Sequence, residues 1–179
     1  VIVPIYKGEE SKAVIDEKAN KLMEELKNLD IRVKYDNSDH SRPGWKFAEY
    51  ELKGVPIRIA MGLRDIEQNV VELARRDTKA KHTQTLVGLP EYVNNLLVEI
   101  QDGMFKKALA FREDKTTEAN TWEEFIDILD NKTGFVSAHW DGTAETEELI
   151  KQEAKATIRC IPLHNKLEEG VCIKTGKPS

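Results

Sequence analysis

The sequence is poor in cysteine and histidine, with two and four of these residues respectively among its 179. Two thiols, Cys160 and Cys172, cannot form a disulfide framework, so the composition is typical of a reducing compartment and we expect a cytoplasmic protein. No apolar run approaches the ~20 residues of a membrane-spanning helix, and no basic-then-apolar signal sequence opens the chain. These absences exclude disulfide-rich secreted proteins and predict no membrane partner.

Catalytic signatures are also absent. The sequence has no glycine-rich phosphate loop, no His-Glu-x-x-His and no Gly-x-Ser-x-Gly. The histidines, His40, His82, His139 and His164, are scattered, and none stands at metal-ligand spacing from a second ligand. We therefore expect each histidine to be a surface or structural residue, and we predict no catalytic residue in this chain.

Net charge is modest and unevenly distributed. The chain carries −5 overall, but residues 1–88 hold 16 Lys and Arg against 15 Asp and Glu, whereas residues 89–179 hold 11 against 17. The first half is nearly neutral and can present a local basic face. It is not basic enough to bind nucleic acid by bulk electrostatics, so RNA binding would depend on specific contacts.

Apolar patterning predicts an α/β protein. The elements expected in the first part are strand 1–6, helix 10–29, strand 31–35, helix 45–53, strand 55–61 and a hairpin of strands 69–75 and 81–87. This order predicts a mixed five-stranded sheet with flanking helices. On helix 45–53, the residues expected to face the core are Trp45, Ala48 and Leu52.

The second part of the chain predicts a small α/β domain. A long helix over 91–112 and a polar junction over 113–120 precede helices 121–129 and 144–155 and strands 134–140, 156–163 and 171–173. The expected boundaries are 1–88 for the first domain, 89–117 for a connecting helical segment and 118–179 for the second domain. Because this second domain shows no site of its own, we expect it to act as a structural brace.

One group of residues suggests RNA recognition. Phe47 and Glu51 are four residues apart, so they share one face of a helix, and Arg58, Arg64 and Asp65 follow along the next strand and turn. We expect these residues at one end of the sheet. An aromatic ring stacks on an unpaired base, a carboxylate accepts from guanine N1–H and N2–H₂, and an arginine donates to O6 and N7. The alternative interpretation, helix-face ion pairs and a buried phenylalanine, is the commoner cause of such a pattern.

The segment from Arg42 to Asp65, RPGWKFAEYELKGVPIRIAMGLRD, resembles the anticodon-binding domain of prolyl-tRNA synthetases of the type shared by archaea, eukaryotes and a subset of bacteria. The segments VIVPIYKGEE, VVELARRDT, KATIRCIPL and GKPS are similar to the same family, so the resemblance covers essentially the whole chain. It implies the anticodon-binding fold of class II synthetases, followed by the C-terminal domain of the family. The partner that it implies is proline tRNA, whose second and third anticodon bases are guanine.

The resemblance also assigns roles to individual residues. The base readers of the family fall on Phe47, Glu51, Arg58, Arg64 and Asp65. Family members often have Lys where this chain has Arg64, which keeps the donor. They often have Pro at the position of Leu63, so the turn that carries Arg64 can differ here.

Zinc is not expected, although many members of the family bind it in this second domain through four cysteines. The matching positions here are Asp141, Thr146, Cys172 and Thr175, so a single thiolate remains. We expect hydrogen bonds in place of the metal, with Asp141 capping the helix that begins near Ala144 and Thr146 bonding within its first turn.

The chain also lacks the class II catalytic core that the resemblance implies. We therefore expect a non-catalytic fragment that needs no cofactor. The full-length enzyme would use ATP and Mg²⁺, and would form a homodimer through its catalytic core, which this fragment would contact.

Two other functions fit the sequence. One is an accessory RNA-binding protein that has borrowed the fold, and the other is a doubly wound ligand-binding or signalling module. The second predicts phosphate-binding glycines after the first strand, where Tyr6-Lys7-Gly8-Glu9-Glu10 offers one glycine and two acids.

Overall fold

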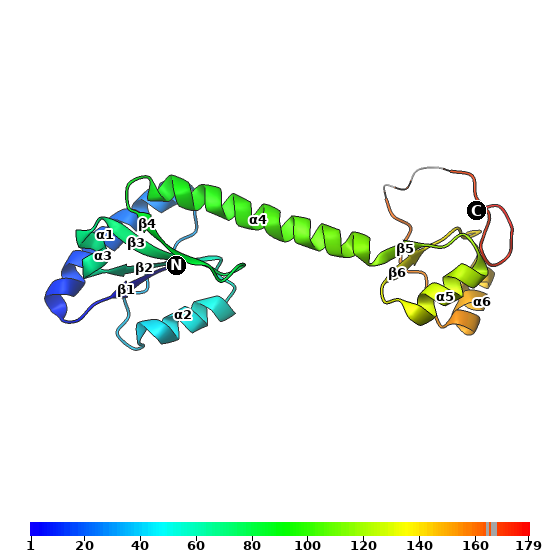
Figure 1. Cartoon of the computed structure of the whole chain (residues 1–179), viewed down its shortest axis with the longest axis horizontal. Helices are drawn as coiled ribbons and strands as arrows, with labels where there is room; N and C mark the ends of the chain where they lie inside the picture. Colours follow the sequence, from blue (N-terminus) through cyan, green and yellow to red (C-terminus); the bar gives the residue numbers. More distant parts are fainter. Residues whose placement is uncertain (164, 166–167) are drawn as a thin grey trace. The chain divides into compact units, whose positions relative to one another are not determined.

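A computed structural model of the protein describes residues 1–163, 165 and 168–179 (Figure 1). The chain divides into two compact units, residues 1–106 and 107–179, and the division falls within one long helix, α4 (Leu89–Asp114). Our expected boundaries at residues 88 and 117 remain a prediction. No helix in the described ranges is both long and apolar enough to cross a membrane.

The first unit is a mixed sheet with helices packed on it, which confirms the predicted α/β class. Before α4 its elements are β1 (Ile2–Ile5), α1 (Glu9–Asn28), α2 (Pro43–Leu52), β2 (Ile57–Gly62), α3 (Leu63–Glu67), β3 (Val70–Arg75) and β4 (Lys81–Thr85). The sheet order is β1-β2-β3-β4, with β1 parallel to β2 and the predicted β3–β4 hairpin antiparallel. The turn that the sequence predicted at Arg64 and Asp65 is part of helix α3.

The sheet has four strands, and our prediction of five was wrong. The expected strand 31–35 makes a single bridge, between Tyr35 and Ile2. Its first residue, Ile31, is still hydrogen-bonded to the end of α1, because its N–H donates to the Leu26 carbonyl at 3.1 Å. Only the end of the segment reaches β1, where Ile2 N–H donates to Lys34 and Asp36 N–H donates to Ile2.

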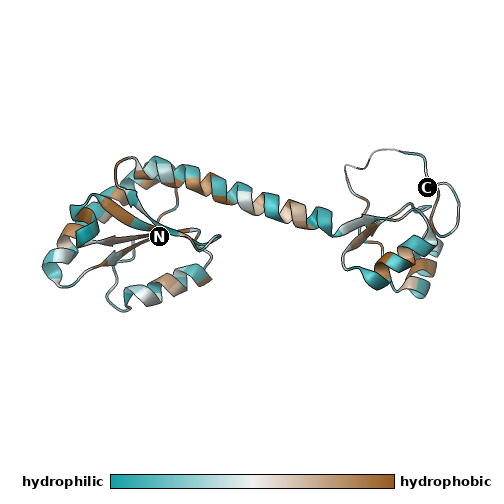
Figure 2. Cartoon of the chain, viewed as in Figure 1, coloured by the Kyte–Doolittle hydropathy of each residue, from teal (hydrophilic) through white to brown (hydrophobic). Residues whose placement is uncertain are grey.

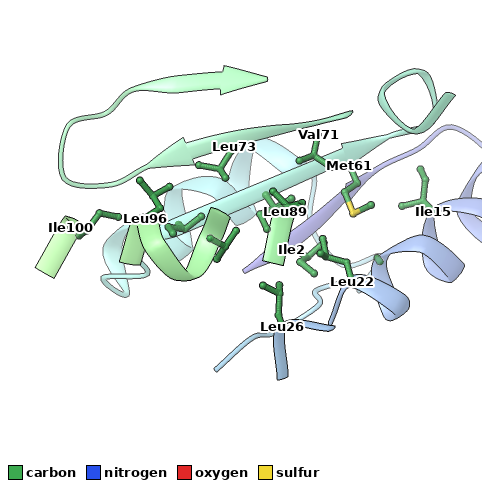
Figure 3. Close-up of a cluster of buried hydrophobic side chains, with 14 residues drawn as sticks. Ile2, Ile15, Leu22, Leu26, Met61, Val71, Leu73, Leu89, Leu96 and Ile100 are labelled. Atoms are coloured by element: carbon green, nitrogen blue, oxygen red, sulfur yellow. The ribbon is translucent and has the colours of Figure 1, made fainter. Parts of the chain in front are cut away.

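One apolar core lies between the sheet, α1 and the first half of α4 (Figure 3). Alternate residues of β2 and β3 point into it, and β1 and β2 are buried along most of their length, which is why these strands are rich in apolar residues (Figure 2). The helical contributions are Ile15, Ala19, Leu22 and Leu26 of α1 and Leu89, Val93, Leu96 and Ile100 of α4. Val14 and Leu29 of α1 are exposed, whereas Ile15 is buried.

Helix α2 buries a different face from the predicted one. Trp45 is 58% exposed, Leu52 is 87% exposed and Ala48 is also exposed, whereas Lys46 and Tyr50 are buried. The prediction was wrong because hydrophobic periodicity assigns a lysine to solvent. Here Lys46 finds carbonyl and carboxylate partners inside the protein, so the helix turns its polar residue inward.

The turn after α2 fixes how the chain enters β2. Gly54 has φ of 80°, a left-handed conformation that favours glycine. Its N–H donates to the Glu51 carbonyl at 3.1 Å, and the Val55 N–H donates to the Tyr50 carbonyl at 3.0 Å. This pair of hydrogen bonds ends the helix within one turn and brings β2 back beside it.

The second unit is a small α/β domain. After the end of α4 its elements are β5 (Thr116–Glu118), α5 (Trp122–Asn131), β6 (Phe135–Ser137) and α6 (Ala144–Ala154). Strand β5, parallel to β6, lies where the sequence predicted a polar junction. The predicted strand 156–163 is irregular, and the segment 171–173 makes one bridge, between Val171 and Pro178.

Candidate nucleic-acid interface

Three of the five predicted base readers lie together. Phe47 and Glu51 on α2 and Arg58 on β2 line one small hollow, which Tyr50 and Arg76 also line. Helical spacing explains the first pair, and the tight turn at residue 54 returns β2 to the same place. The volume of the hollow is about 40 Å³, which admits a few water molecules and not a nucleobase.

Arg58 is held on two sides. Its guanidinium carbon lies 3.6 Å from the centroid of the Phe47 ring, a close cation–π contact. One terminal nitrogen, Nη2, donates to Glu72 Oε1 of β3 at 3.2 Å. Nε is buried and has no hydrogen-bond partner among the described residues. The side chain, 14% exposed, therefore has a fixed plane and an unused donor.

Glu51 is connected to the β3–β4 hairpin. Its carboxylate pairs with the Lys79 ammonium, and its backbone carbonyl accepts from Arg76 Nε at 2.8 Å. Our sequence reasoning missed Arg76 and Lys79. The available signal was the run from residue 75 to 81, Arg-Arg-Asp-Thr-Lys-Ala-Lys, in which four of seven residues are basic.

Arg64 and Asp65 lie at the opposite end of β2, so the expectation that all five residues share one end of the sheet was wrong. At ~3.3 Å per residue, Arg58 is already about 13 Å from Gly62, the last residue of the strand. Asp65 Oδ2 accepts from the Gly62 N–H at 3.0 Å and so caps α3. Arg64 is exposed on the same short helix.

A buried polar network fixes α2 against the loop before it. Lys46 Nζ donates to the carbonyls of Asp36 at 2.8 Å and Ser38 at 2.7 Å, and lies 3.3 Å from Asp36 Oδ1. Tyr50 OH donates to Asp36 Oδ2 at 2.8 Å, and Ser38 donates to Oδ1. Desolvation raises the pKa of Asp36, but the hydrogen bonds from Ser38, Tyr50 and Lys46 outweigh it and hold that pKa well below its usual range. Lys46 and Tyr50 each precede a predicted base reader, so this network sets the position of Phe47 and Glu51.

Three of the four positions that match the family's zinc ligands meet in the second unit, where the Asp141 carboxylate accepts from two threonines. Asp141 Oδ2 accepts from Thr146 at 2.9 Å and from Thr175 at 2.8 Å, and Oδ1 accepts from Thr143 at 2.9 Å. Desolvation raises the pKa of Asp141, yet the threonine hydrogen bonds lower it to about 2. Thr143, not Asp141, is the N-cap of α6, so that part of our expectation was wrong.

This donor set does not suit zinc. A structural zinc site closes with four ligands, most often cysteine and histidine, whereas this cluster offers the Cys172 thiol, one carboxylate and neutral hydroxyls. Across residues 1–163, 165 and 168–179, no group of three His, Cys, Asp or Glu side chains could hold a metal ion. The position of His164 lies outside these ranges. His82 shares a hydrogen bond with Tyr92, and His139 shares one with Ser179.

Comparison with known proteins agrees with these features. Residues 1–96 match the family described as anticodon binding domain, and residues 122–179 match the family described as prolyl-tRNA synthetase, C-terminal. Proline–tRNA ligases of Porphyromonas gingivalis and Parabacteroides distasonis are each 56% identical over all 179 residues, and that of Cytophaga hutchinsonii is 55% identical. The chain spans 36% of the length of each of these relatives.

The matches agree with the fold as well as with the residues. The anticodon-binding match covers the mixed sheet with its flanking helices and the beginning of α4, and the second match begins at the first residue of α5. The chain therefore belongs to the anticodon-binding domain family and carries, in its second unit, the C-terminal domain of prolyl-tRNA synthetases.

Proposed function

We propose that this chain recognises the anticodon of proline tRNA as part of a proline–tRNA ligase. Support comes from the two matched domain families and from relatives that carry this name. Attachment of proline with ATP and Mg²⁺ would belong to a catalytic core in the same protein. We further propose that this core makes the homodimer, and that the protein works in the cytoplasm, where tRNA is charged.

The observation that carries the proposal is the cluster of Phe47, Arg58 and Glu51 around one hollow. Guanine presents two donors, N1–H and N2–H₂, beside the O6 acceptor. Glu51 can accept from both donors after it releases Lys79, and Arg58 can donate to O6 and N7. Adenine lacks both the O6 acceptor and the N1–H donor, so it cannot satisfy the same pair.

A second reading point at the other end of β2 is consistent with an anticodon that has two guanines. Arg64 offers a guanidinium in solvent, and Asp65 has one carboxylate oxygen, Oδ1, beyond the oxygen that caps α3. The length of β2 places this point apart from Arg58 along the strand. This separation suits two bases that are unstacked and splayed apart, as in loops recognised by sequence.

A titration of the chain with anticodon stem-loops tests this function. At one stated salt concentration, a proline stem-loop should bind at least ~10-fold more tightly than one with both guanines replaced by adenine. Equal affinity for the two loops would mean that phosphate contacts alone account for the binding, which would contradict the proposal. A doubly wound ligand-binding module is not supported, because β3 and β4 are antiparallel to their neighbours.

An accessory RNA-binding protein would show the same preference for guanine. The two functions differ in what the longer protein does. If the chain is part of a ligase, the longer protein includes the catalytic core of a class II synthetase and attaches proline to tRNA in the presence of ATP. Absence of this activity in the longer protein, with guanine preference retained, would favour the accessory role.

A further inference from the structure

The ring of Phe47 is not free to receive a base on the face that lines the hollow. The Arg58 guanidinium carbon is 3.6 Å from the ring centroid, which is van der Waals contact between two flat groups. A base inserted between them would need roughly twice this spacing. The hollow beside them, about 40 Å³, has no room for one either.

We propose that Phe47 is a positioning residue, which holds the guanidinium plane of Arg58 ready for guanine, and is not the surface on which the base stacks. This inference rests on the proposed function for its RNA part. The arrangement is a stack of ring and guanidinium, with Glu72 fixing the guanidinium at its edge through Nη2.

The contacts of Arg58 explain why such a platform matters. Arginine carries considerable rotamer freedom, and a bidentate contact requires its fork in one orientation. Glu72 is half-exposed and accepts from only one nitrogen, so this ion pair alone leaves the plane of the group free to turn. The Phe47 ring removes this freedom before RNA binds, which lowers the entropic cost of reading the base.

The buried Nε gives a signal that does not depend on RNA. Because this N–H has almost no access to solvent, its proton should exchange slowly and give a resolved resonance in a ¹⁵N spectrum of the free chain. Loss of the aromatic platform would expose it and broaden the resonance.

The experiment compares F47L, which keeps a similar apolar volume without a π face, with F47Y, which restores the π face. W45L is the matched control, because Trp45 is an exposed aromatic residue on another side of the same helix. We expect F47L to broaden the Arg58 Nε resonance and to reduce the preference for guanine over adenine by about tenfold, with F47Y recovering most of both. W45L should change neither.

A double-mutant comparison separates positioning from stacking. If Phe47 acts through Arg58, F47L added to R58A should change the preference by less than about twofold beyond R58A alone. A base stacked directly on Phe47 would instead make F47L weaken binding of guanine-containing and guanine-free loops alike, with the Arg58 resonance unchanged, and this result overturns the inference.

The proposed function can fail separately. If the wild-type chain shows no preference for guanine, the function is contradicted, and the Nε resonance still decides the structural part. A resonance broadened in F47L and recovered in F47Y supports the platform, and one that is unaffected by F47L overturns it.

Discussion

Replacement of Lys46 by methionine tests the most unexpected feature of α2. Lys46 is 3% exposed, and its ammonium donates to two backbone carbonyls and pairs with Asp36. Methionine keeps the aliphatic stem that packs in the helix interface and removes only the charged donor. The substitution therefore isolates the polar network from the packing around it.

The structure sets the size of the effect. Removal of one member of a buried ion pair costs ~3–5 kcal/mol, because the remaining charge is buried without its partner. Asp36 keeps its hydrogen bonds from Ser38 and Tyr50, so the lower end of this range applies. We expect K46M to reduce the free energy of unfolding of the first unit by about 3 kcal/mol.

The assay is hydrogen exchange of the buried amides of β2, which reports the opening of the first unit alone. Trp45 supplies the matched control from the neighbouring position. As an exposed residue it should cost only about 0.5 kcal/mol when truncated to alanine. The reasoning would be refuted if W45A cost ~3–5 kcal/mol, as truncation of a buried aromatic residue does, while K46M changed nothing.

Other substitutions have separable effects. E51Q should reduce the preference for guanine in a stem-loop titration by ~1–3 kcal/mol. The unfolding midpoint should stay unchanged, because the Glu51 carboxylate is exposed. A lower midpoint with an intact preference would mean that Glu51 is a structural residue. D65A should destabilise the first unit by about 1 kcal/mol in the amide exchange assay, because the cap of α3 is lost. R64A should lower only the affinity for RNA. An equal loss of stability in the two variants would contradict these assignments. The Asp141 carboxylate should stabilise the second unit above about pH 4, the ordinary range of an aspartate, and this contribution should disappear as pH falls towards its folded pKa of about 2. Acid unfolding followed by tryptophan fluorescence should therefore show a weaker dependence on pH in D141N. Elemental analysis of the purified chain should find no stoichiometric zinc, and near-stoichiometric zinc would contradict the interpretation of that cluster.

Local signals predicted the elements of the fold that depend on local chemistry. The apolar pattern predicted the β3–β4 hairpin, and it predicted helix 45–53 close to the observed bounds of α2. Failures came where partners distant in the sequence decide the outcome. The inward face of α2 depends on Asp36 accepting a lysine, and segment 31–35 has a strand-like pattern but only one pairing with β1.

In the candidate site, too, local spacing was predictable from the sequence and contacts between distant segments were not. Phe47 and Glu51 were predictable neighbours because four residues make about one helical turn, and the glycine turn made Arg58 their neighbour too. Arg64 and Asp65 were expected beside them because the prediction did not take into account that the length of the strand separates these two residues from Arg58. Lys79, which reaches Glu51 from the hairpin, required the three-dimensional arrangement of strands and helix.

The most direct test of anticodon recognition combines one substitution with one base change. Affinities of wild type and R58A are measured for a proline anticodon stem-loop and for the same loop with its guanines replaced by adenine, at one salt concentration. If Arg58 reads guanine, R58A weakens binding to the proline loop by ~1–3 kcal/mol and leaves binding to the adenine loop nearly unchanged. Equal weakening for both loops would contradict this role, because Arg58 would then contact phosphate or serve only as the structural partner of Glu72.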